Sequence, residues 1–543
     1  MSAGASWDAL IVGGGHNGLV AAAYLARQGL SVKVLEARPI LGGAAVTEEF
    51  HPGFRNSSCS YLVGMLSPRV IAELELERHG LRIVRRPASE FAPQPDGRYL
   101  LKGDGADFPA QLDAFHAGDG TAYEAFDADL DATVRLVRRV MEQRPPRLVA
   151  GRDSIAPVVG AVAEARHLSE RQRALVLRLL TSSAANFLDR YFGGEAVKGM
   201  YAYLAAVGNL QSPHATGSAY VLLHHSFGES NGETGAWGHA IGGMGAVSDA
   251  IARSAAAAGA AFELNARVAR ILTRAGAACG VALEDGREYA AHTVVAGVNP
   301  KLLYQRLLDP SLLPAAVLED IDHYRCLSGT LRINVALAEL PDFKALPGRE
   351  MGLHHQASVI IAPSIAHQEQ AYDDAKNGGW AREPLIEMWI SSTVDPTLAP
   401  EGRHVASLFC QHFHRRLSGG RDWDDHREEV ADLVIRTIGE YAPNFPGAVL
   451  GRRVLTPKDL ETEYGLVGGD IFHGALHLDQ LFALRPVAGY ADYRTPVPGV
   501  YLCGSGAHPG GGVTGVPGRS AAREILRDLR GRRLGRRRKS LTR

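Results

Sequence analysis

The most constraining feature of this sequence is a glycine-rich turn between an apolar run and an alanine-rich stretch near the N-terminus. Ala9–Val12 form the apolar run, and Gly13, Gly15 and Gly18 follow with G-x-G-x-x-G spacing. The first glycine permits a tight turn, the second lets a pyrophosphate approach the backbone, and the third lets a helix pack closely on a sheet. This pattern predicts a strand, a dinucleotide-binding turn and a helix.

The turn leads into a predicted helix whose first N–H groups have no partner within the helix. These groups and the positive end of the helix dipole attract phosphate, so we expect Gly14, His16 and Asn17 to contact the dinucleotide as well. A second predicted strand, residues 31–35, ends on Glu36, close to the spacing at which an acid binds a ribose hydroxyl. Glu36 also disfavours a 2′-phosphate there, because like charges repel. A turn that binds nothing is the alternative, and the flanking strand and helix count against it.

The segment after Glu36 contains Glu-x-Arg followed by a glycine pair. Its residues of interest are Ala37, Arg38, Gly42, Gly43 and Ala44. In this segment the sequence resembles the FAD-containing amine oxidase and phytoene desaturase superfamily. The resemblance implies that these residues lie along the diphosphate of FAD, and it favours FAD over NAD.

The middle of the chain has a Gly-Gly-Met segment, an alanine-rich helix and a hairpin whose turn is Asp285-Gly286. It resembles the middle of the same superfamily. The resemblance implies that Val268 contacts the adenine through its backbone, although a buried aliphatic residue would give the same pattern.

A second strand, glycine loop and helix close the chain. Residues 500–503 are the predicted strand, and a helix is expected from about residue 520. In phytoene desaturase-like proteins the loop between them packs against the flavin ring and ribityl chain. The resemblance therefore adds these cofactor-binding residues: Gly504, His508, Gly511, Gly512 and Val513.

The remaining segments predict a second domain. Helical periodicity covers 121–143 and 169–184, and a further helix is expected over 423–441. Strands are expected at 81–84 and 98–101, joined by an Asp96-Gly97 turn, and at 329–335, 385–390 and 404–410. We predict that these later strands form a mixed sheet on the floor of a substrate cavity.

The predicted fold class is α/β, with a discontinuous Rossmann-like FAD-binding domain and a mixed α+β substrate domain that carries a helical insert. The FAD-binding domain comprises residues 1–90, 235–300 and 485–528. The substrate domain comprises residues 91–234 and 301–484, and its helical block could equally serve dimerisation or core bulk. Residues 529–543 form a basic tail that we expect to be disordered.

Polar residues upstream of the C-terminal loop are candidates for the substrate site. We place His473, Asp479 and Arg485 near the substrate, together with His477. The spacing of the two histidines and Asp479 could suggest a metal site, but the glycines around them disfavour the helix that would align the ligands, so no metal is predicted. Hydrogen-bonded structural residues are the equal alternative.

Composition limits the partners and the compartment. The chain has 543 residues and a net charge of −1, so nothing in the whole-chain balance indicates nucleic acid. Its five cysteines are scattered without a C-x-x-C pair, which fits a reducing compartment and no redox dithiol. The first strand begins within about eight residues of the start and no apolar spanning segment follows, so we expect a cytoplasmic protein. The basic tail predicts contact with anionic lipid, and a homo-oligomer is left open.

Further motifs narrow the resemblance. His224-His225, Phe227 and Trp237-Gly, with Tyr493-Arg-Thr-Pro, resemble most the pyridine nucleotide-disulfide oxidoreductase domain-containing protein 2 group, which lies beside phytoene dehydrogenase-like proteins. This resemblance implies the cofactor and leaves the substrate open. We expect hydride transfer to flavin N5 from a small, apolar substrate. The alternatives are a flavin-dependent amine oxidase and a catalytically silent FAD-binding scaffold.

Overall fold

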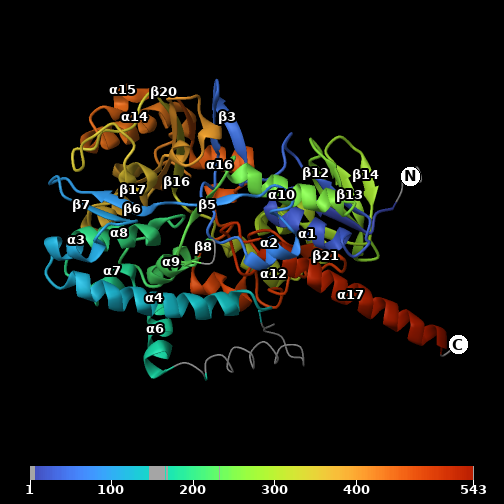
Figure 1. Ribbon diagram of the computed structural model, residues 1–543. Helices are drawn as coiled ribbons and strands as arrows, with labels where there is room; N and C mark the ends of the chain where they lie inside the picture. The colour runs from blue at the N-terminus through green and yellow to red at the C-terminus, as the bar shows by residue number, and fades with distance from the viewer. Residues whose placement is uncertain (1–5, 146–165, 167–168, 231–232, 542–543) are drawn as a thin grey trace.

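A computed structural model describes residues 6–145, 166, 169–230 and 233–541. The chain forms two lobes (Figure 1). One lobe contains both described ends of the chain, with α1, α10 and α17 (His16–Ala26, Met244–Ala257 and Val516–Leu541). The other lobe contains a large sheet, with helix α14 (Trp423–Tyr441) on its upper side in Figure 1 and a layer of helices below it.

A five-stranded parallel sheet is the centre of the first lobe. Its order is β11-β2-β1-β15-β21, and every neighbouring pair is parallel. The strands, in sheet order, are Ala261–Glu263, Val32–Leu35, Ala9–Val12, Val294–Ala296 and Val500–Leu502. Strands from the beginning, middle and end of the chain therefore lie side by side, as the discontinuous domain predicted.

Helix α1 packs closely on its neighbours because small residues face them. All of its side chains except Tyr24 are buried. A Cβ atom on Gly18 would lie 2.2 Å from the Gly13 carbonyl oxygen, and one on Gly518 of α17 would lie 2.2 Å from the Asn17 carbonyl oxygen. Only glycine permits such approaches, so α1 is held directly against the turn and against α17.

A three-stranded antiparallel sheet completes this lobe. It consists of β12 (Val268–Arg274), β13 (Ala277–Leu283) and β14 (Glu288–Ala290). The last two strands are joined by the Asp285-Gly286 turn, where Gly286 has a φ of 87°. The predicted hairpin is confirmed.

The second lobe is built on a seven-stranded mixed sheet of order β20-β16-β19-β18-β17-β6-β7. The β17–β6 pair is parallel and the other pairs are antiparallel. The strands, in sheet order, are Val449–Leu455, Thr330–Leu337, His404–Phe413, Trp380–Trp389, Ser358–Ile361, Ala88–Pro93 and Tyr99–Gly103. The predicted mixed sheet is confirmed.

The two faces of this sheet have different neighbours. On β18, Ile386 and Met388 belong to an apolar cluster with α14, whereas Leu385 on the opposite face packs with the helical block. The face toward the helical block also carries buried polar side chains, among them Arg332, Ser358 and Glu387. Buried polar groups on one face of a sheet indicate that this face can contact a polar group as well as pack against apolar side chains.

The helical block covers this polar face. Its helices are α3 (Phe108–Phe115), α4 (Asp119–Met141), α6 (Glu170–Thr181), α7 (Ala184–Leu188), α8 (Glu195–Ala206) and α9 (Ser218–His225). Tyr203 of α8 donates a hydrogen bond of 3.0 Å to the Phe409 carbonyl of β19. The block therefore covers the polar face of the sheet, whether or not it also serves dimerisation.

One predicted connection between strands and one predicted domain boundary are wrong. The Asp96-Gly97 turn joins β6 to β7, and not the strand at 81–84, because β6 lies between them in the chain. The predicted strand at 81–84 is β5 (Ile83–Arg85), which pairs with β10 (Gly238–Ala240) in the first lobe. Since β6 belongs to the seven-stranded sheet, the expected boundary at residue 90 cuts through a strand of the second lobe.

Helix α17 includes the basic segment as far as Leu541. The expected disorder of this tail is not tested and stays a prediction. Arg, Lys and Leu have high helix propensity and no proline interrupts them, which allows α17 to extend past the sheet. Residues 542 and 543 lie outside the described part of the chain.

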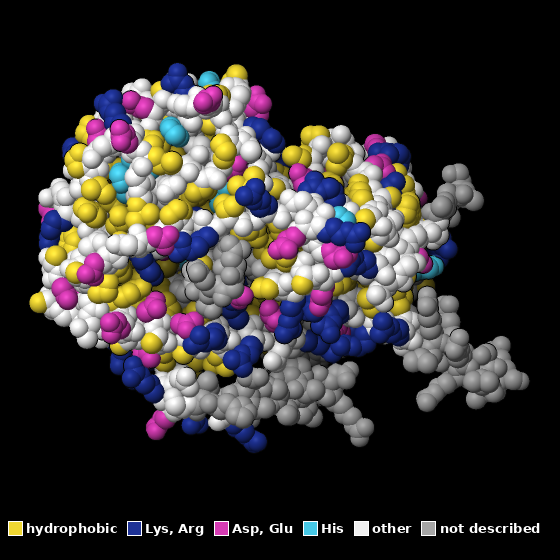
Figure 2. All heavy atoms as spheres, in the orientation of Figure 1, with side chains coloured by type: hydrophobic (Ala, Val, Ile, Leu, Met, Phe, Trp, Pro, Cys, Tyr) yellow, Lys and Arg dark blue, Asp and Glu magenta, His cyan; other side chains and the backbone are white. Residues whose placement is uncertain are grey.

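The surface mixes charges of both signs. Figure 2 shows Lys and Arg side chains interspersed with Asp and Glu over the visible face. No helix in the described ranges has a stretch long and apolar enough to cross a membrane. The absence of a nucleic-acid partner, contact with anionic lipid and a homo-oligomer are not tested by these features and stay predictions.

An ion pair connects helix α2 (Pro68–Glu73) to both α1 and α17. Arg519 donates two hydrogen bonds, of 2.8 and 2.7 Å, to the Glu73 carboxylate, and the Tyr24 hydroxyl donates a third of 2.5 Å. The hydrogen bonds from Arg519 lower the pKa of Glu73 to about 2. A lowered carboxylate pKa stabilises the fold above pH 4.5, its ordinary value, and that contribution is lost as the pH falls toward 2.

We predict that Glu73→Gln lowers the free energy of unfolding by about 1 kcal/mol at pH 7, a modest effect because the pair is partly exposed. Urea denaturation of both proteins from pH 7 to pH 2.5 measures it. The difference between them should shrink as the pH falls below about 4.5. A difference that stays constant over this range would show that the ion pair is not its source.

Candidate functional site

The glycine turn adopts the geometry that its sequence predicts. Gly13 has a φ of 96°, a left-handed conformation that favours glycine, and Gly15 is the N-cap of α1. A Cβ atom on Gly15 would meet no atom nearer than the Gly43 Cα, at 3.9 Å. Gly15 is therefore free of the protein on the side where a phosphate would approach.

Glu36 closes the turn from the end of β2. One carboxylate oxygen accepts a hydrogen bond of 2.7 Å from the Gly14 N–H, and the other accepts one of 2.8 Å from the Arg38 N–H. A carboxylate has about four lone-pair sites, so it can still accept a ribose hydroxyl. Glu36 thus orients the turn, and its contact with a ribose hydroxyl stays a prediction.

The glycine pair lies against the fingerprint turn. The Gly42 N–H donates a hydrogen bond of 2.8 Å to the Gly14 carbonyl. A Cβ atom on Gly43 would lie 3.1 Å from the Gly15 Cα. A side chain at Gly43 would push the two loops apart, whereas one at Gly42 would meet the Ala45 carbonyl oxygen at 2.6 Å.

A cavity of about 790 Å³ runs along these loops. Its volume is in the range of ligand sites. The predicted cofactor residues that line it are Gly13, Gly15, His16, Asn17, Glu36, Ala37, Arg38, Gly43, Ala44, Val268 and Gly504. Gly14, Gly18 and Gly42 lie behind the wall and shape it, and His473 joins the lining from the candidate substrate residues.

Other lining residues were not identified from the sequence. Asn299, Lys301 and Arg306 follow β15, and Tyr464 and Leu466 come from the second lobe. Arg38 is held by an ion pair of 2.9 Å with Glu48 and stacks over the Tyr464 ring, 4.4 Å from its centre. Asn299 comes three residues after β15, a buried parallel strand, and ligands bind beyond the carboxyl ends of such strands, so the sequence could have identified it. No local pattern in the sequence indicates that Tyr464 approaches this cavity.

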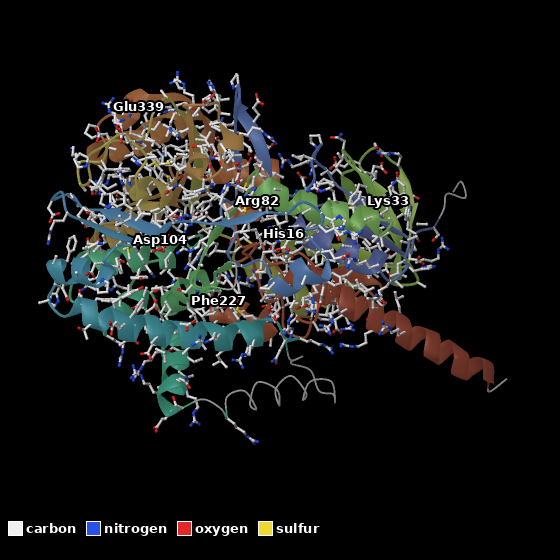
Figure 3. The ribbon with its side chains drawn as sticks, in the orientation of Figure 1. His16, Lys33, Arg82, Asp104, Phe227 and Glu339 are labelled. Atoms are coloured by element: carbon white, nitrogen blue, oxygen red, sulfur yellow. The ribbon has the colours of Figure 1, made fainter. Side chains whose placement is uncertain are left out.

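Buried polar atoms without protein partners face this region. His16 Nε2, Asn17 Oδ1 and His473 Nδ1 have no hydrogen-bond partner among the described residues. Burial lowers the pKa of His16 to about 3, helped by His473, and lowers the pKa of His473 to about 4. Both imidazoles are therefore neutral at pH 7. Figure 3 shows His16 near the junction of the two lobes. Unsatisfied polar atoms beside a cavity fit a polar ligand such as the central part of FAD.

The C-terminal glycine loop leaves this cavity at Gly504 and packs between segments of both lobes. A Cβ atom on Gly511 would lie 2.7 Å from Phe472, and one on Gly512 would lie 2.7 Å from the Met65 sulfur. His508 is buried with both ring nitrogens unpartnered among the described residues, and burial lowers its pKa to about 4. Bare backbone and neutral side chains suit a flat ring, as the resemblance implies. His508, Gly511, Gly512 and Val513 do not line the 790 Å³ cavity itself.

Two of the candidate substrate residues have structural roles. Arg485 is completely buried and donates hydrogen bonds of 2.7 and 3.0 Å to the carbonyls of Phe472 and Ser505, so it holds the glycine loop in place. Asp479 lies at the surface, paired with Arg325 at 2.6 Å, because the turn Leu478–Gln480 directs it outward. Neither residue lines a cavity described here, which corrects their predicted placement toward the substrate.

His477 and Asp479 do not join His473 in a metal site. Within the described ranges, the structure contains no group of three His, Cys, Asp or Glu side chains that could hold a metal ion. His473 belongs instead to the wall of the larger cavity.

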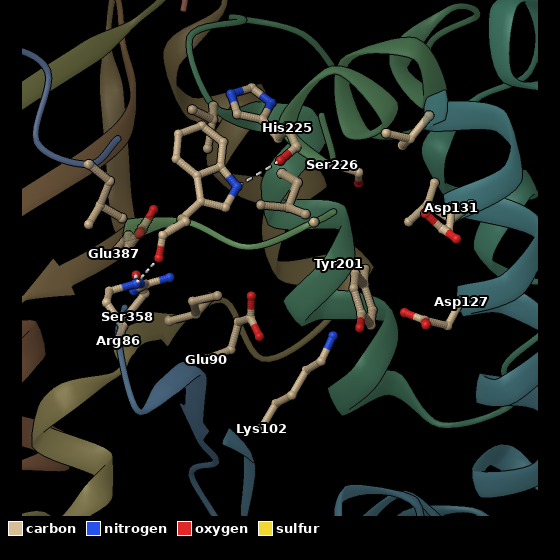
Figure 4. Close-up of a pocket in the computed structure, with 18 of the residues that line it drawn as sticks. Arg86, Glu90, Lys102, Asp127, Asp131, Tyr201, His225, Ser226, Ser358 and Glu387 are labelled. Carbon is tan, nitrogen blue, oxygen red and sulfur yellow. Dashed lines mark hydrogen bonds between the residues drawn. The ribbon is translucent and has the colours of Figure 1, made fainter. Parts of the chain in front are cut away.

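A second cavity, of about 490 Å³, lies between the helical block and the polar face of the seven-stranded sheet (Figure 4). Tyr61 and Leu62 line this cavity, and they belong to the segment that follows the cofactor loops in the chain. His225 lines it and lies 5.7 Å, between ring centres, from Phe472, which packs on Gly511. One pair of side chains therefore separates the second cavity from the C-terminal glycine loop. The sequence predicted a mixed sheet as the floor of a substrate cavity, but it did not identify the residues that line this one.

A cavity shared between the two ends of the chain, beside a second cavity on a mixed sheet, fits the two-lobed flavin-dependent oxidoreductase expected from the sequence. Residues 18–526 match the flavin containing amine oxidoreductase family. The chain belongs to this family, and its cofactor is FAD.

Relatives and solved structures agree with this assignment. The rat pyridine nucleotide-disulfide oxidoreductase domain-containing protein 2 is 41% identical over 545 residues, covering 96% of this chain and 94% of the rat protein. A neurosporene-forming phytoene desaturase of Rhodobacter capsulatus is 25% identical over 523 residues, covering 94% of this chain and 92% of that protein. Cyclohexylamine oxidase of Brevibacterium oxydans has a similar fold, with a TM-score of 0.60 at 18% identity, covering 97% of this chain and 100% of that one.

We predict that Gly15→Val abolishes FAD binding without unfolding the protein. The new side chain would enter the cavity, where the pyrophosphate approaches, and would meet little protein. The flavin released on denaturation and the thermal unfolding of the variant measure the two effects. A variant that retains full FAD would contradict this placement.

Gly18→Val is the matched comparison in the same turn. Its Cβ would lie 2.2 Å from the Gly13 carbonyl oxygen, so we expect a loss of about 3 kcal/mol or more in the free energy of unfolding. The two variants thus separate a glycine needed by the ligand from a glycine needed by the fold. Equal destabilisation by both would overturn that distinction.

Proposed function

We propose that this protein is an FAD-dependent dehydrogenase that removes a hydride from a C–H bond of a substrate with an apolar body. The observation that carries the proposal is the contact between the C-terminal glycine loop and the wall of the second cavity, through Phe472 and His225. A substrate in the second cavity would lie beside the part of the chain that the family resemblance assigns to the flavin ring. Bound FAD would supply the hydride acceptor, its N5 atom.

The residues of this chain would bind and orient the two reactants. The turn at Gly13–Gly18 and Glu36 would hold the adenosine and diphosphate end of the cofactor. Arg485 fixes the carbonyls of Phe472 and Ser505, which sets the position of the glycine loop. The helical block covers the second cavity and reduces its contact with water. Positioning of this kind lowers the barrier of a hydride transfer. The neighbouring carbon would then lose a proton, to water or to a carboxylate of the cavity such as Glu387, so that a double bond forms.

The chemistry of the second cavity supports a substrate with an apolar part. Its aliphatic lining residues are Leu62, Leu130, Val134, Leu204, Val207 and Ile360. The relationship to a phytoene desaturase points the same way, since that enzyme is named for the desaturation of a hydrocarbon. A cavity beside the loop also counts against a catalytically silent scaffold.

Amine oxidation is the second candidate. Tyr61 and Trp237 provide aromatic walls in the second cavity, as an amine oxidase would require, and Glu387 provides a carboxylate. The fold likeness to cyclohexylamine oxidase concerns the fold alone.

Anaerobic bleaching of the bound flavin distinguishes the two candidates. We expect at least one apolar compound from a panel of phytoene, a monoterpene hydrocarbon and decanoate to bleach the visible flavin absorbance of the purified protein within minutes, because hydride transfer reduces the flavin. Cyclohexylamine should leave the absorbance unchanged. Bleaching by the amine and by none of the apolar compounds would overturn the proposal in favour of amine oxidation, and Gly15→Val provides the cofactor-free control.

A further inference from the structure

The floor of the second cavity carries charged side chains in register across three strands. Lys102 on β7 lies opposite Glu90 on β6, and Glu90 lies opposite Ser358 on β17. All three residues line the cavity, together with Arg86, which directly precedes β6. A cavity that served only an apolar molecule would have no need for this row.

The two cations of the floor form no salt bridge in the described part of the chain, although Glu90 lies opposite Lys102 and its carboxylate attracts both of them. Arg86 is 7% exposed and donates hydrogen bonds of 2.9 Å to the Trp237 carbonyl and to the Ser358 hydroxyl. Its guanidinium stacks over Trp389, 5.0 Å from the ring centre. Lys102 lies 5.4 Å from the centre of the Tyr123 ring. Glu90 is one carboxylate shared by two cations, so a bound anion would balance the second positive charge.

Each acidic residue of the same cavity has a partner, although one oxygen of Asp131, Oδ1, has none among the described residues. Glu387 accepts a hydrogen bond of 2.6 Å from Tyr61, Asp127 accepts one of 3.3 Å from Tyr123, and Asp131 pairs with Arg135 at 2.6 Å. Glu90 accepts a hydrogen bond from Ser89. Burial also raises the pKa of Glu387, which lowers its negative charge. The groups left for a ligand are therefore mainly the two cations.

A buried hydroxyl adds a donor at the same place. Tyr201 of α8 lines the cavity, is 7% exposed, and its hydroxyl has no hydrogen-bond partner among the described residues. Figure 4 shows the Lys102 ammonium group directed toward Tyr201. An ammonium and a phenol that converge on one point match the two oxygens of a carboxylate.

We propose that this end of the second cavity binds the carboxylate of an apolar acid, through Lys102 and Tyr201 with Arg86 beside them. The inference rests on the proposed function and names the class of its substrate. Figure 4 shows Lys102 and His225 on opposite sides of the cavity, and His225 is the side nearest the glycine loop. A carboxylate held at Lys102 would leave the aliphatic chain to extend between the apolar walls toward that loop.

Calorimetric titration of the FAD-containing protein tests this proposal with three ligands that share one alkyl chain: decanoate, 1-decanol and decylamine. We expect decanoate to bind at least about tenfold more tightly than 1-decanol, the effect of one or two hydrogen bonds to a charged group, and decylamine to bind most weakly. Lys102→Met should reduce the affinity for decanoate to that for the alcohol, and Lys102→Arg should restore most of the preference.

Arg135→Met is the matched control, because Arg135 lines the same cavity but is paired with Asp131. It should leave the preference for decanoate unchanged. Equal binding of the three ligands, tighter binding of decylamine, no binding of decanoate, or an unchanged preference in Lys102→Met would each overturn the proposal. Binding requires no turnover, so a protein that binds decanoate but is never reduced would refute the proposed reaction and leave this site standing.

Discussion

Contact between bare backbone segments is the constraint on which the rest of this structure depends. Helix α1 touches the Gly13 carbonyl at Gly18, and α17 touches α1 at Gly518, at distances that no Cβ atom allows. Parallel pairing of β1, β15 and β21 brings the start, middle and end of the chain into one sheet. The FAD cavity forms where these segments meet, so cofactor binding and the assembly of the first lobe require the same glycines.

The second lobe follows from a sheet with two different faces. Its apolar face packs on α14 and supplies stability, while the opposite face carries buried polar groups under the helical block. Phe472 and His225 connect the resulting cavity to the glycine loop. The neutral histidines around the cofactor region, His16, His473 and His508, have pKa values lowered by burial and add no charge near pH 7. The protein thus has neutral histidines around the cofactor region and charged side chains on the floor of the second cavity.

Particular elements show how far the sequence could predict this arrangement. The fingerprint turn, the Asp285-Gly286 hairpin and helix 423–441 were predicted because each has a local signal: glycine spacing, turn residues, or a 3.6-residue apolar period. Strand β6 was missed, because its sequence, Ala88–Pro93, begins and ends with residues that are rare in strands and it is held by pairing with β17 and β7. The outward direction of Asp479 depends on one short turn and its contact with Arg325, which no pattern in the chain encodes.

The sequence by itself determined the dinucleotide-binding turn, because glycines at fixed spacings are needed wherever backbone must approach a phosphate or another backbone. The choice of FAD and the role of the C-terminal glycine loop came from the family resemblance. Only the tertiary structure decided which polar residues face a ligand. Lys102, Arg86 and Tyr201 are far apart in the chain and converge through strand register and the placement of α8 over the sheet. Arg485, which by sequence could have faced the substrate, is instead surrounded by carbonyl groups and holds the loop. Convergence of distant side chains depends on long-range packing, which has no local signal, and for that reason the residues that line the second cavity could be identified only from the fold.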